Sequence, residues 1–533
     1  MLRMMAGGIA MVASGTLLAA CGSEDAEDDD AVGASGAGPA AVTNTITSSS
    51  GSIPDEFVFA NEREPSDLLP GWGGGFGPAT VLRALYQPLI NPRISLDDNG
   101  FVISEMEMVL ASAYEQVDET RWRFVLREDV RFHNGEAFNA QAVKVNFDYN
   151  TDEAVLAKYD RSDQLGVAIA ACEIVDDMTV DFVLTKPDNE VPGFRLRGLL
   201  FVPPSLLEAQ GFDSLFENPV GTGPYKFESW TRGQDLLLSK FEDYWKTDAF
   251  GANMPAVRFI VRPEASVRAQ TVTAGEAHFA YNIGMELAQT LDQSIQGGGF
   301  QSSGIRLNNT IEPTSNYDLR KAMNLAIDRQ GIIDSIFLGA ATPLAFFGFQ
   351  PVELDPYPYD PEEAAKLISD GGWDGTELEL IYGENRIPEE PQLAEIYKAS
   401  FEAVGLKIKL SRLDANQYND ISGADFNLQP PVVMETTSSG NSGEIAGGLR
   451  DKYGCDGTGT FCDLAFDAEY DELAALTGDE RTAKLQSIAE RLHLEETSRI
   501  WVAGVQQVHG IAANVETNFP TNTYAFMDDI RFT

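Results

Sequence analysis

The sequence has few basic residues, few histidines and few cysteines, and each shortage excludes a class of protein. Only 38 lysines and arginines stand against 82 aspartates and glutamates, which gives a formal net charge of −44. A surface of this charge repels phosphate backbones, so we expect no nucleic-acid partner. The four histidines are scattered along 533 residues, which argues against a histidine-built metal site. We therefore expect neither a metal nor a cofactor.

Motifs of common exported hydrolases are also missing. The sequence contains no Gly-x-Ser-x-Gly, no His-Glu-x-x-His and no Gly-x-x-x-x-Gly-Lys pattern. Pairs of carboxylates occur everywhere in so acidic a chain and therefore carry no information about catalysis. These absences favour a binding protein that is not an enzyme, and an exported hydrolase remains the alternative.

What the sequence does contain is typical of a folded α/β protein. Apolar residues make up 43% and aromatic residues 10% of a chain that is long enough for two or three packed units. Alternating and helical spacings of apolar residues are mixed along its whole length. We expect helices at 139–150, 319–337, 361–369 and 394–404, strands at 121–130, 180–184, 236–239 and 406–410, and a loop at 388–392.

The first 20 residues have the layout of a signal peptide. Arg3 precedes a run of small and apolar residues that is diluted by glycine and serine, unlike a membrane span. Leu18-Ala19-Ala20-Cys21 resembles the bacterial lipobox, which implies cleavage before Cys21 and acylation of its sulfur, for example with palmitate. The acidic, small-residue stretch 21–52 is expected to be a disordered tether. The protein would then be attached by its N-terminal lipid to the cell membrane or reside in the periplasm.

The other cysteines allow two interpretations. Cys455 and Cys462 flank a short turn-forming loop that could close a disulfide outside the cytoplasm; a metal pair is the competing interpretation, although the spacing is wrong for a zinc knuckle. The lack of a nearby histidine favours the disulfide. Cys172 follows two alanines and is expected to be a buried thiol.

Six short motifs, in order across about residues 55–510, resemble one known family. They are Leu85-Tyr86-Gln87-Pro88-Leu89, Phe124 to Gly135 with its Phe132-His133-Asn134-Gly135 turn, Gly221-Thr222-Gly223-Pro224-Tyr225, Tyr244-Trp245, Asp318 to Arg329, and Tyr359-Asp360-Pro361. They are similar to motifs of family 5 extracellular solute-binding proteins, the peptide- and nickel-type receptors of ABC importers. Asn134 departs from the pattern, because the family usually has Asp there. His133 is expected to have a structural role in its turn.

This resemblance implies a two-lobed, periplasmic-binding-protein-like fold of class II type. Lobe one would comprise residues 53–85, 213–303 and 505–533, with an extra subdomain at 86–212, and lobe two residues 306–500. Hinge strands are expected near 305–308 and 500–505. A monomeric protein would capture a small solute by hinge closure and deliver it to an ABC permease with its ATPase. A sensory role for the same fold remains open.

The resemblance also suggests residues that line the cleft. Trp72 and Phe76 stand in a loop too rich in glycine to bury them by regular packing. Tyr281 and Asn282 follow the segment 275–277, close to which the family lines its cleft. Phe347 is a further candidate, although a place in the core competes with this interpretation.

Glu435 is the remaining candidate, and it bears on the identity of the ligand. Peptide-binding relatives often carry a Trp and an Asp in lobe two, and the Asp pairs with the amino terminus of the peptide. The segment 431–441 has neither residue and contains Glu435 instead. This difference leaves the ligand open between a peptide and a sugar, an opine or a metal chelate.

Overall fold

The computed structural model describes the chain from residue 53 onward, with gaps. The described ranges are 53–71, 76–96, 102–159, 165–216, 218–246, 253–347, 352–383, 387–422, 428–438, 449–450, 452–455, 461–517 and 527–533. The expected signal peptide and tether lie outside these ranges. Within them, no helix combines the length and apolar character needed to cross a bilayer.

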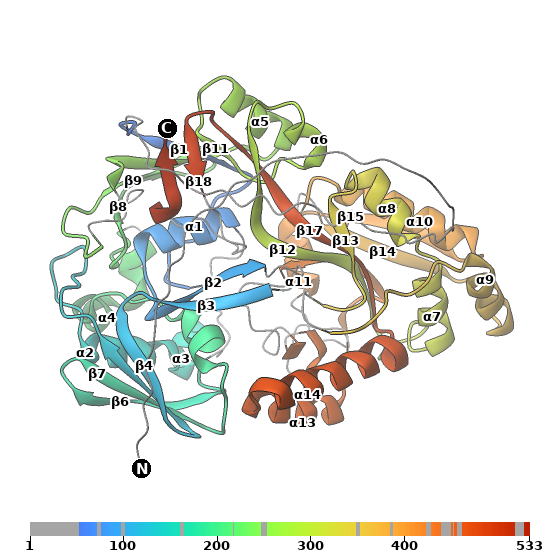
Figure 1. The fold of residues 1–533 in the computed structure, drawn as a ribbon, viewed down its shortest axis with the longest axis horizontal. Helices are drawn as coiled ribbons and strands as arrows, with labels where there is room; N and C mark the ends of the chain where they lie inside the picture. The colour runs from blue at the N-terminus through green and yellow to red at the C-terminus, as the bar shows by residue number, and fades with distance from the viewer. Residues whose placement is uncertain are drawn as a thin grey trace, which may run out of the picture. The chain divides into compact units, whose positions relative to one another are not determined.

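A mixed 11-stranded sheet organises most of the described chain (Figure 1). In order across the sheet, its strands are β15 (Lys407–Leu413), β14 (Glu377–Gly383), β16 (Val432–Ser438), β12 (Ser294–Leu307), β17 (Arg499–Ile511), β11 (Phe279–Ala280), β1 (Phe57–Asn61), β10 (Ala256–Val261), β9 (Asp235–Lys240) and β8 (Tyr225–Thr231), and β13 (Ala341–Pro343) pairs with β17. The strands β10, β1 and β11 are parallel neighbours, as are β15, β14 and β16. Two parallel segments therefore flank a central antiparallel pair.

The central pair, β12 and β17, connects the two halves of the sheet. Its register runs from Ser294 opposite Gly510 to Arg306 opposite Arg499, with two irregularities on the way. Figure 1 shows these long strands crossing from the half that contains β1 and β11 to the half that contains β14 and β15. The expected hinge segments, 305–308 and 500–505, fall within or at the end of this pair.

Smaller sheets and helices complete the fold. The other sheets have the orders β4 (Ala111–Asp118), β5 (Arg121–Leu126), β7 (Thr179–Leu184), β6 (Ile169–Asp176); β2 (Ile90–Leu96), β3 (Val102–Met108); and β18 (Val515–Thr517), β19 (Ile530–Phe532). The α-helices are α1 (Phe76–Leu85), α2 (Ala140–Asn150), α3 (Glu153–Lys158), α4 (Pro204–Gln210), α5 (Ala265–Thr273), α6 (Met285–Ala288), α7 (Tyr317–Leu325), α8 (Arg329–Ile336), α9 (Pro361–Asp370), α10 (Glu390–Ala403), α11 (Ala415–Ser422), α13 (Leu464–Ala475) and α14 (Gly478–Glu490). Shorter helical turns are η1 (Val191–Arg195), η2 (Leu196–Gly198), η3 (Gly211–Phe216), η6 (Arg491–Glu496) and η7 (Met527–Asp529).

Separate hydrophobic cores stabilise the different parts of the fold. One core packs α1 against the β1 half of the sheet and includes Phe57 and Tyr225. A second lies under the four-stranded sheet and includes Phe124 and Phe182. The β14 half has its own core around α7 and α10. A further cluster joins α13 and α14 to Trp501.

Two sequence predictions about secondary structure were wrong. The expected single helix 319–337 is two helices, α7 and α8, because the Asp328 side chain accepts a hydrogen bond from the Gly331 N–H and caps a new start. The expected loop 388–392 overlaps the first turn of α10, in which Pro391 is tolerated because first-turn N–H groups have no helical partner. The expected helix 361–369 is α9, and the Asp360 side chain caps it by accepting from the Glu363 N–H at 3.0 Å.

The short motifs noted in the sequence meet in space. His133 donates its backbone N–H to the Gly221 carbonyl at 2.8 Å, and its Nδ1 accepts the Gly221 N–H at 3.2 Å. Its Nε2 lies 2.9 Å from the Gly223 carbonyl oxygen. Gly223 in turn donates to the Leu85 carbonyl at 2.9 Å. Three motifs far apart in the sequence therefore form one joint between the four-stranded sheet, α1 and β8.

Candidate functional site

A buried ion-pair cluster lies where β16, β12 and β17 run side by side. Glu435 on β16 stands opposite Gly304 of β12 and forms ion pairs with Arg499, the first residue of β17, and with Lys452, whose Nζ is 3.3 Å away. Arg499 also donates from Nη2 to the Lys452 carbonyl oxygen at 3.0 Å. The Glu435 and Arg499 side chains are only 8% and 2% exposed. The carboxylate is therefore already neutralised by two cations.

The same cluster contains a second arginine on the neighbouring strand. Arg306 is directly opposite Arg499 in the β12–β17 register, an arrangement that sets two like charges against each other. Burial, and to a lesser degree the Arg306 guanidinium, lower the pKa of Arg499. The contact with Glu435 acts in the opposite direction, because an anion favours the protonated guanidinium.

Aromatic rings cover the ion-pair cluster on one side. Phe347 packs against Trp501 with a distance of 5.7 Å between ring centroids, and Lys452 Nζ lies 5.6 Å from the Phe347 ring. The Arg499 guanidinium carbon is 5.1 Å from the centre of the Tyr453 ring. Phe347 is 2% exposed, so it belongs to the core around α13 and α14 and also contacts a member of the polar cluster.

A second polar group lies at the other end of β17. Tyr281 follows β11, and its hydroxyl accepts a hydrogen bond from Gln507 Nε2 at 2.6 Å. Asn282 has a left-handed backbone with a φ of 38°. Its N–H donates to His509 Nδ1 at 3.1 Å, and its carbonyl accepts from Arg268 Nη2 at 2.8 Å. Burial raises the pKa of Tyr281, and the nearby Glu62 carboxylate adds to this increase.

The structure divides the predicted site residues into these two groups. Glu435 and Phe347 are linked through Lys452 at the β16 end, and Tyr281 and Asn282 adjoin each other at the β11 end. Trp72 lies outside the described residues. Phe76 begins α1.

The three cysteines that the structure describes behave as structural residues. Cys455 and Cys462 are joined by a disulfide. Cys172 is a buried thiol whose pKa burial raises to about 12. Among the described residues, no group of three or more histidine, cysteine, aspartate or glutamate side chains is arranged to hold a metal ion.

Sequence reasoning missed the charged partners in this region. Arg499, Lys452 and Gln507 were not among the predicted site residues. The only available signal was a charged residue next to a predicted hinge strand, Arg499. Such a residue cannot be distinguished from a solvent-exposed one without the tertiary structure.

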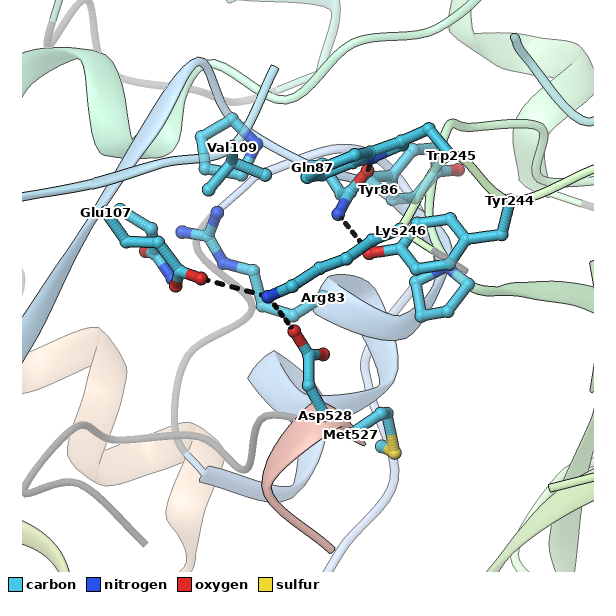
Figure 2. A pocket seen from close by; sticks show the side chains of 13 residues that line it. Arg83, Tyr86, Gln87, Glu107, Val109, Tyr244, Trp245, Lys246, Met527 and Asp528 are labelled. Carbon is cyan, nitrogen blue, oxygen red and sulfur yellow. Dashed lines mark hydrogen bonds and ion pairs between the residues drawn. The ribbon is translucent and has the colours of Figure 1, made fainter. Parts of the chain in front are cut away.

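A small cavity elsewhere in the molecule is lined by residues of three of the short motifs (Figure 2). Gln87 donates to the Tyr244 hydroxyl at 2.8 Å and accepts from Trp245 Nε1 at 2.9 Å. Lys246 pairs with Glu107 and with Asp528, at 3.1 and 2.6 Å. The cavity volume is about 50 Å³, which is far below the roughly 300–1,000 Å³ of small-molecule sites. Its polar groups tie the C-terminal segment to β3.

Two halves of a sheet are joined by paired crossing strands, and a polar cluster lies beside each end of β17. This arrangement defines a two-lobed binding protein. The chain belongs to the bacterial extracellular solute-binding proteins of family 5, whose model matches residues 105–437. The family resemblance and the fold class expected from the sequence are thereby confirmed. This is a family of binding proteins.

Curated relatives agree with this assignment. The glutathione-binding protein GsiB of Pectobacterium atrosepticum is 31% identical over 356 residues, which cover 63% of this chain and 65% of the relative. GsiB of Salmonella typhi is 30% identical over 331 residues, 59% of this chain and 62% of the relative. The match therefore spans less than two thirds of the length of these relatives.

Solved structures of low sequence identity share the fold. The periplasmic binding protein DppA of Helicobacter pylori, in complex with the peptide STSA, superposes with a TM-score of 0.78 at 21% identity, covering 90% of this chain and 98% of DppA. The dipeptide-binding protein of Pseudoalteromonas sp. SM9913, in complex with Met-Leu, gives 0.78 at 18% identity, with 90% and 100% covered. NikA of Brucella suis, in complex with Fe(III)-EDTA, gives 0.74 at 22% identity, again with 90% and 100% covered.

Proposed function

We propose that the chain is the extracytoplasmic solute-binding component of an ABC importer and captures a peptide-like small solute. The observation that carries this proposal is the position of the two buried polar groups. One contains Glu435 and Arg499, the other Tyr281 and Gln507, and they lie beside β17 in the two halves of the sheet that this strand connects. In a family of solute-binding proteins, such an arrangement can contact one ligand from both halves.

Closure about the crossing strands is the mechanism that this arrangement supports. Lobe one would be residues 53–85, 213–303 and 505–533, its subdomain 86–212, and lobe two 306–500. A solute that touches both lobes has a higher affinity for the closed state and shifts the population toward it. The chain's own residues therefore supply binding and closure, and no catalytic step is required.

The ligand class is supported by the relatives. GsiB is a glutathione-binding protein, and two of the structurally similar proteins were solved with a tetrapeptide or a dipeptide. These ligands all carry amide groups together with charged ends. A peptide-like solute matches the mixture of carboxylate, guanidinium, amide and aromatic groups in the two polar groups of this chain.

The expected location and partners are those of an anchored receptor. The lipobox-like stretch 18–21 supports lipidation of Cys21 and attachment to the membrane, and the acidic residues 21–52 would form the tether. A single saturated chain binds membranes only reversibly, so stable attachment needs more than one acyl chain. The partners would be the permease and ATPase of the importer, with the receptor acting as a monomer.

A ligand screen tests this function directly. The full-length chain, purified in mild detergent, is heated with glutathione, the dipeptide Met-Leu, longer peptides, oligosaccharides, opines and metal chelates. A solute at a hundredfold excess over its Kd stabilises the folded state by about 2.7 kcal/mol. We expect a rise in Tm with at least one peptide-like solute. A protein that binds none of these solutes but hydrolyses a chromogenic ester or glycoside would contradict the proposal.

A further inference from the structure

Three buried acceptor oxygens lie close to the edge of the sheet where β1 and β11 end. Asn61 is the last residue of β1 and is 3% exposed, Glu62 follows it, and Gln507 on β17 is 5% exposed. Asn61 Oδ1, Glu62 Oε2 and Gln507 Oε1 are each buried without a hydrogen-bond donor among the residues that the structure describes. A buried polar atom left without a partner costs about 1–3 kcal/mol, so three such atoms need an explanation.

Tyr281 bonds to the end of β1 through its backbone and to Gln507 through its hydroxyl, and we call Asn61, Glu62 and Gln507 together the acceptor wall. Its backbone N–H donates to the Ala60 carbonyl at 2.9 Å, next to Asn61. Its hydroxyl accepts a hydrogen bond from Gln507 Nε2 at 2.6 Å. The oxygen of the same Gln507 amide takes no part in this bond. Glu62 directly follows Asn61 in the chain, and its charge adds to burial in raising the pKa of Tyr281.

The position of the acceptor wall is that of a ligand site. β1 and β11 are parallel, and open α/β sheets bind ligands outside the carboxyl ends of their strands. Asn61 is held from the other side by α1, since a Cβ added at Gly77 would come within 2.9 Å of the Asn61 side chain. The close approach of α1 fixes the amide of Asn61 at this edge.

The charge of the acceptor wall is opposite to that of the polar cluster in the other half. Glu62 is the acidic member. Arg63 is 3.6 Å away and 44% exposed, and the buried Arg268 also acts on the Glu62 charge while it donates to the Tyr281 and Asn282 carbonyls. Glu435, by contrast, already pairs with Arg499 and Lys452. A ligand cation would have to displace these two side chains to reach Glu435, whereas Glu62 keeps one buried oxygen without a donor.

We propose that Asn61, Glu62 and Gln507 bind the ammonium group of the ligand, which makes the ligand a primary amine such as a peptide with a free amino end. An ammonium group has three N–H donors and no acceptor, so it matches three oxygens that lack a donor of their own. Hydrogen bonds between charged partners are about twice as strong as neutral ones. This assignment rests on the proposed function and places the ligand's amine on the β1 side, away from Glu435.

Isothermal titration of the full-length protein tests the assignment with four probes: glutathione, Met-Leu and the N-acetylated form of each. N-acetylation removes the ammonium charge and keeps most of the remaining ligand, so we expect at least about tenfold weaker binding to the wild type. Glu62→Gln is expected to weaken the binding of the free amines by a similar factor and to change that of the acetylated probes by less than about twofold.

Controls separate this role from a structural one. Glu276→Gln alters an exposed carboxylate after α5 and is expected to leave the affinity for all four probes unchanged. Glu62→Gln should keep or raise the Tm, because burial of the Glu62 carboxylate raises its pKa and disfavours its charged form. Gln507→Met, which removes the acceptor at nearly constant length, provides a second variant and is expected to weaken only the free amines.

Two results would overturn the assignment in different ways. Equal affinities for free and N-acetylated probes, or an unchanged affinity in Glu62→Gln, would remove the ammonium site and leave the solute-binding function intact. Failure of the wild type to bind any probe, together with a negative solute screen, would reject the proposed function and the ammonium site with it.

Discussion

Glu190 and Arg481 form an ion pair between segments that are 291 residues apart in the sequence. The Glu190 side chain is 1% exposed, and it also accepts a hydrogen bond from the Tyr470 hydroxyl at 3.2 Å. The backbone N–H of the adjacent Asn189 donates to the Ala474 carbonyl at 3.0 Å. The segment that leads from β7 into η1 is therefore docked on α13 and α14, which belong to the half of the fold assigned to lobe two.

Replacing Arg481 by Met tests the contribution of this docking contact. The substitution takes a cation away from a carboxylate that has almost no access to water. Breaking a buried ion pair costs about 3–5 kcal/mol, and we expect the lower end because Arg481 is itself 19% exposed. Urea denaturation would measure the loss in the free energy of unfolding.

The matched control for Arg481→Met is Lys366→Met on α9. Lys366 pairs with Glu363 at the surface and is 65% exposed, so its loss should change stability by less than about 1 kcal/mol. Adding Glu190→Gln to Arg481→Met removes both charges and should recover part of the stability. An Arg481→Met variant as stable as Lys366→Met would show that the contact contributes nothing.

The acid sensitivity of the protein follows in part from His133. Burial lowers the pKa of His133 from 6.5 to about 4, and it outweighs the hydrogen bond to the Gly223 carbonyl, which acts in the opposite direction. The unfolded chain binds a proton near pH 6.5, whereas the folded chain does so only near pH 4. The stabilisation from neutral His133 is therefore complete above pH 6.5 and is lost as the pH falls from 6.5 to 4.

His133→Gln should accordingly flatten the pH dependence of stability. One proton taken up on unfolding contributes a slope of about 1.4 kcal/mol per pH unit, and the variant lacks this contribution. Free energies of unfolding at pH 7, 6 and 5 give the two slopes. His493→Gln should act similarly, since burial also lowers the pKa of His493 to about 4. Parallel profiles for wild type and variants would contradict this interpretation.

Local patterns predicted much of the fold. The alternation of Trp122, Phe124 and Leu126 correctly indicated β5, and the spacing after Asn139 correctly indicated α2. The apolar period predicted for the helix 319–337 is correct, but Asp328 caps a second helix inside this range. The periodicity of apolar residues reflects which side of a segment is buried. It therefore predicts the type of an element more reliably than the residues at which the element begins and ends.

The polar site was less accessible to sequence reasoning. Glu435 is a candidate because it stands in the segment 431–441, which lacks the Trp and Asp of peptide-binding relatives, but its partners Arg499 and Lys452 are 64 and 17 positions away. In a chain with 82 acidic residues, nothing in the sequence marks which carboxylate will be buried beside which cation. Such pairings arise only from the register of β12, β16 and β17, which depends on contacts across the whole sheet.

Reduction of the Cys455–Cys462 disulfide should destabilise the protein modestly. The bond joins cysteines seven positions apart, and closing a loop of this size restricts the unfolded chain by about 2–3 kcal/mol. We expect dithiothreitol to lower the Tm of the wild type and to leave the Tm of the double variant Cys455→Ser, Cys462→Ser unchanged. Equal sensitivity of both proteins would instead point to an effect unrelated to this bond.

The glycines at 221 and 223 allow the tightest backbone contact among the short motifs. A Cβ added at Gly221 would come within 2.1 Å of the Leu85 carbonyl oxygen, and one at Gly223 within 2.2 Å of the Ala84 carbonyl oxygen. Both obstacles are backbone atoms at the end of α1, so no side-chain rotation can relieve the clash. The contact also carries the hydrogen bond from the Gly223 N–H to the Leu85 carbonyl at 2.9 Å.

Gly221→Ala should therefore be among the most damaging single substitutions in this chain. Overpacking usually costs about 1–3 kcal/mol, and we expect more than about 3 because backbone must move and the joint with His133 must open. Gly198→Ala is the control, since a Cβ there meets nothing within 4 Å. If thermal and urea denaturation gave both variants the stability of the wild type, the packing of α1 against this turn would be looser than the structure shows.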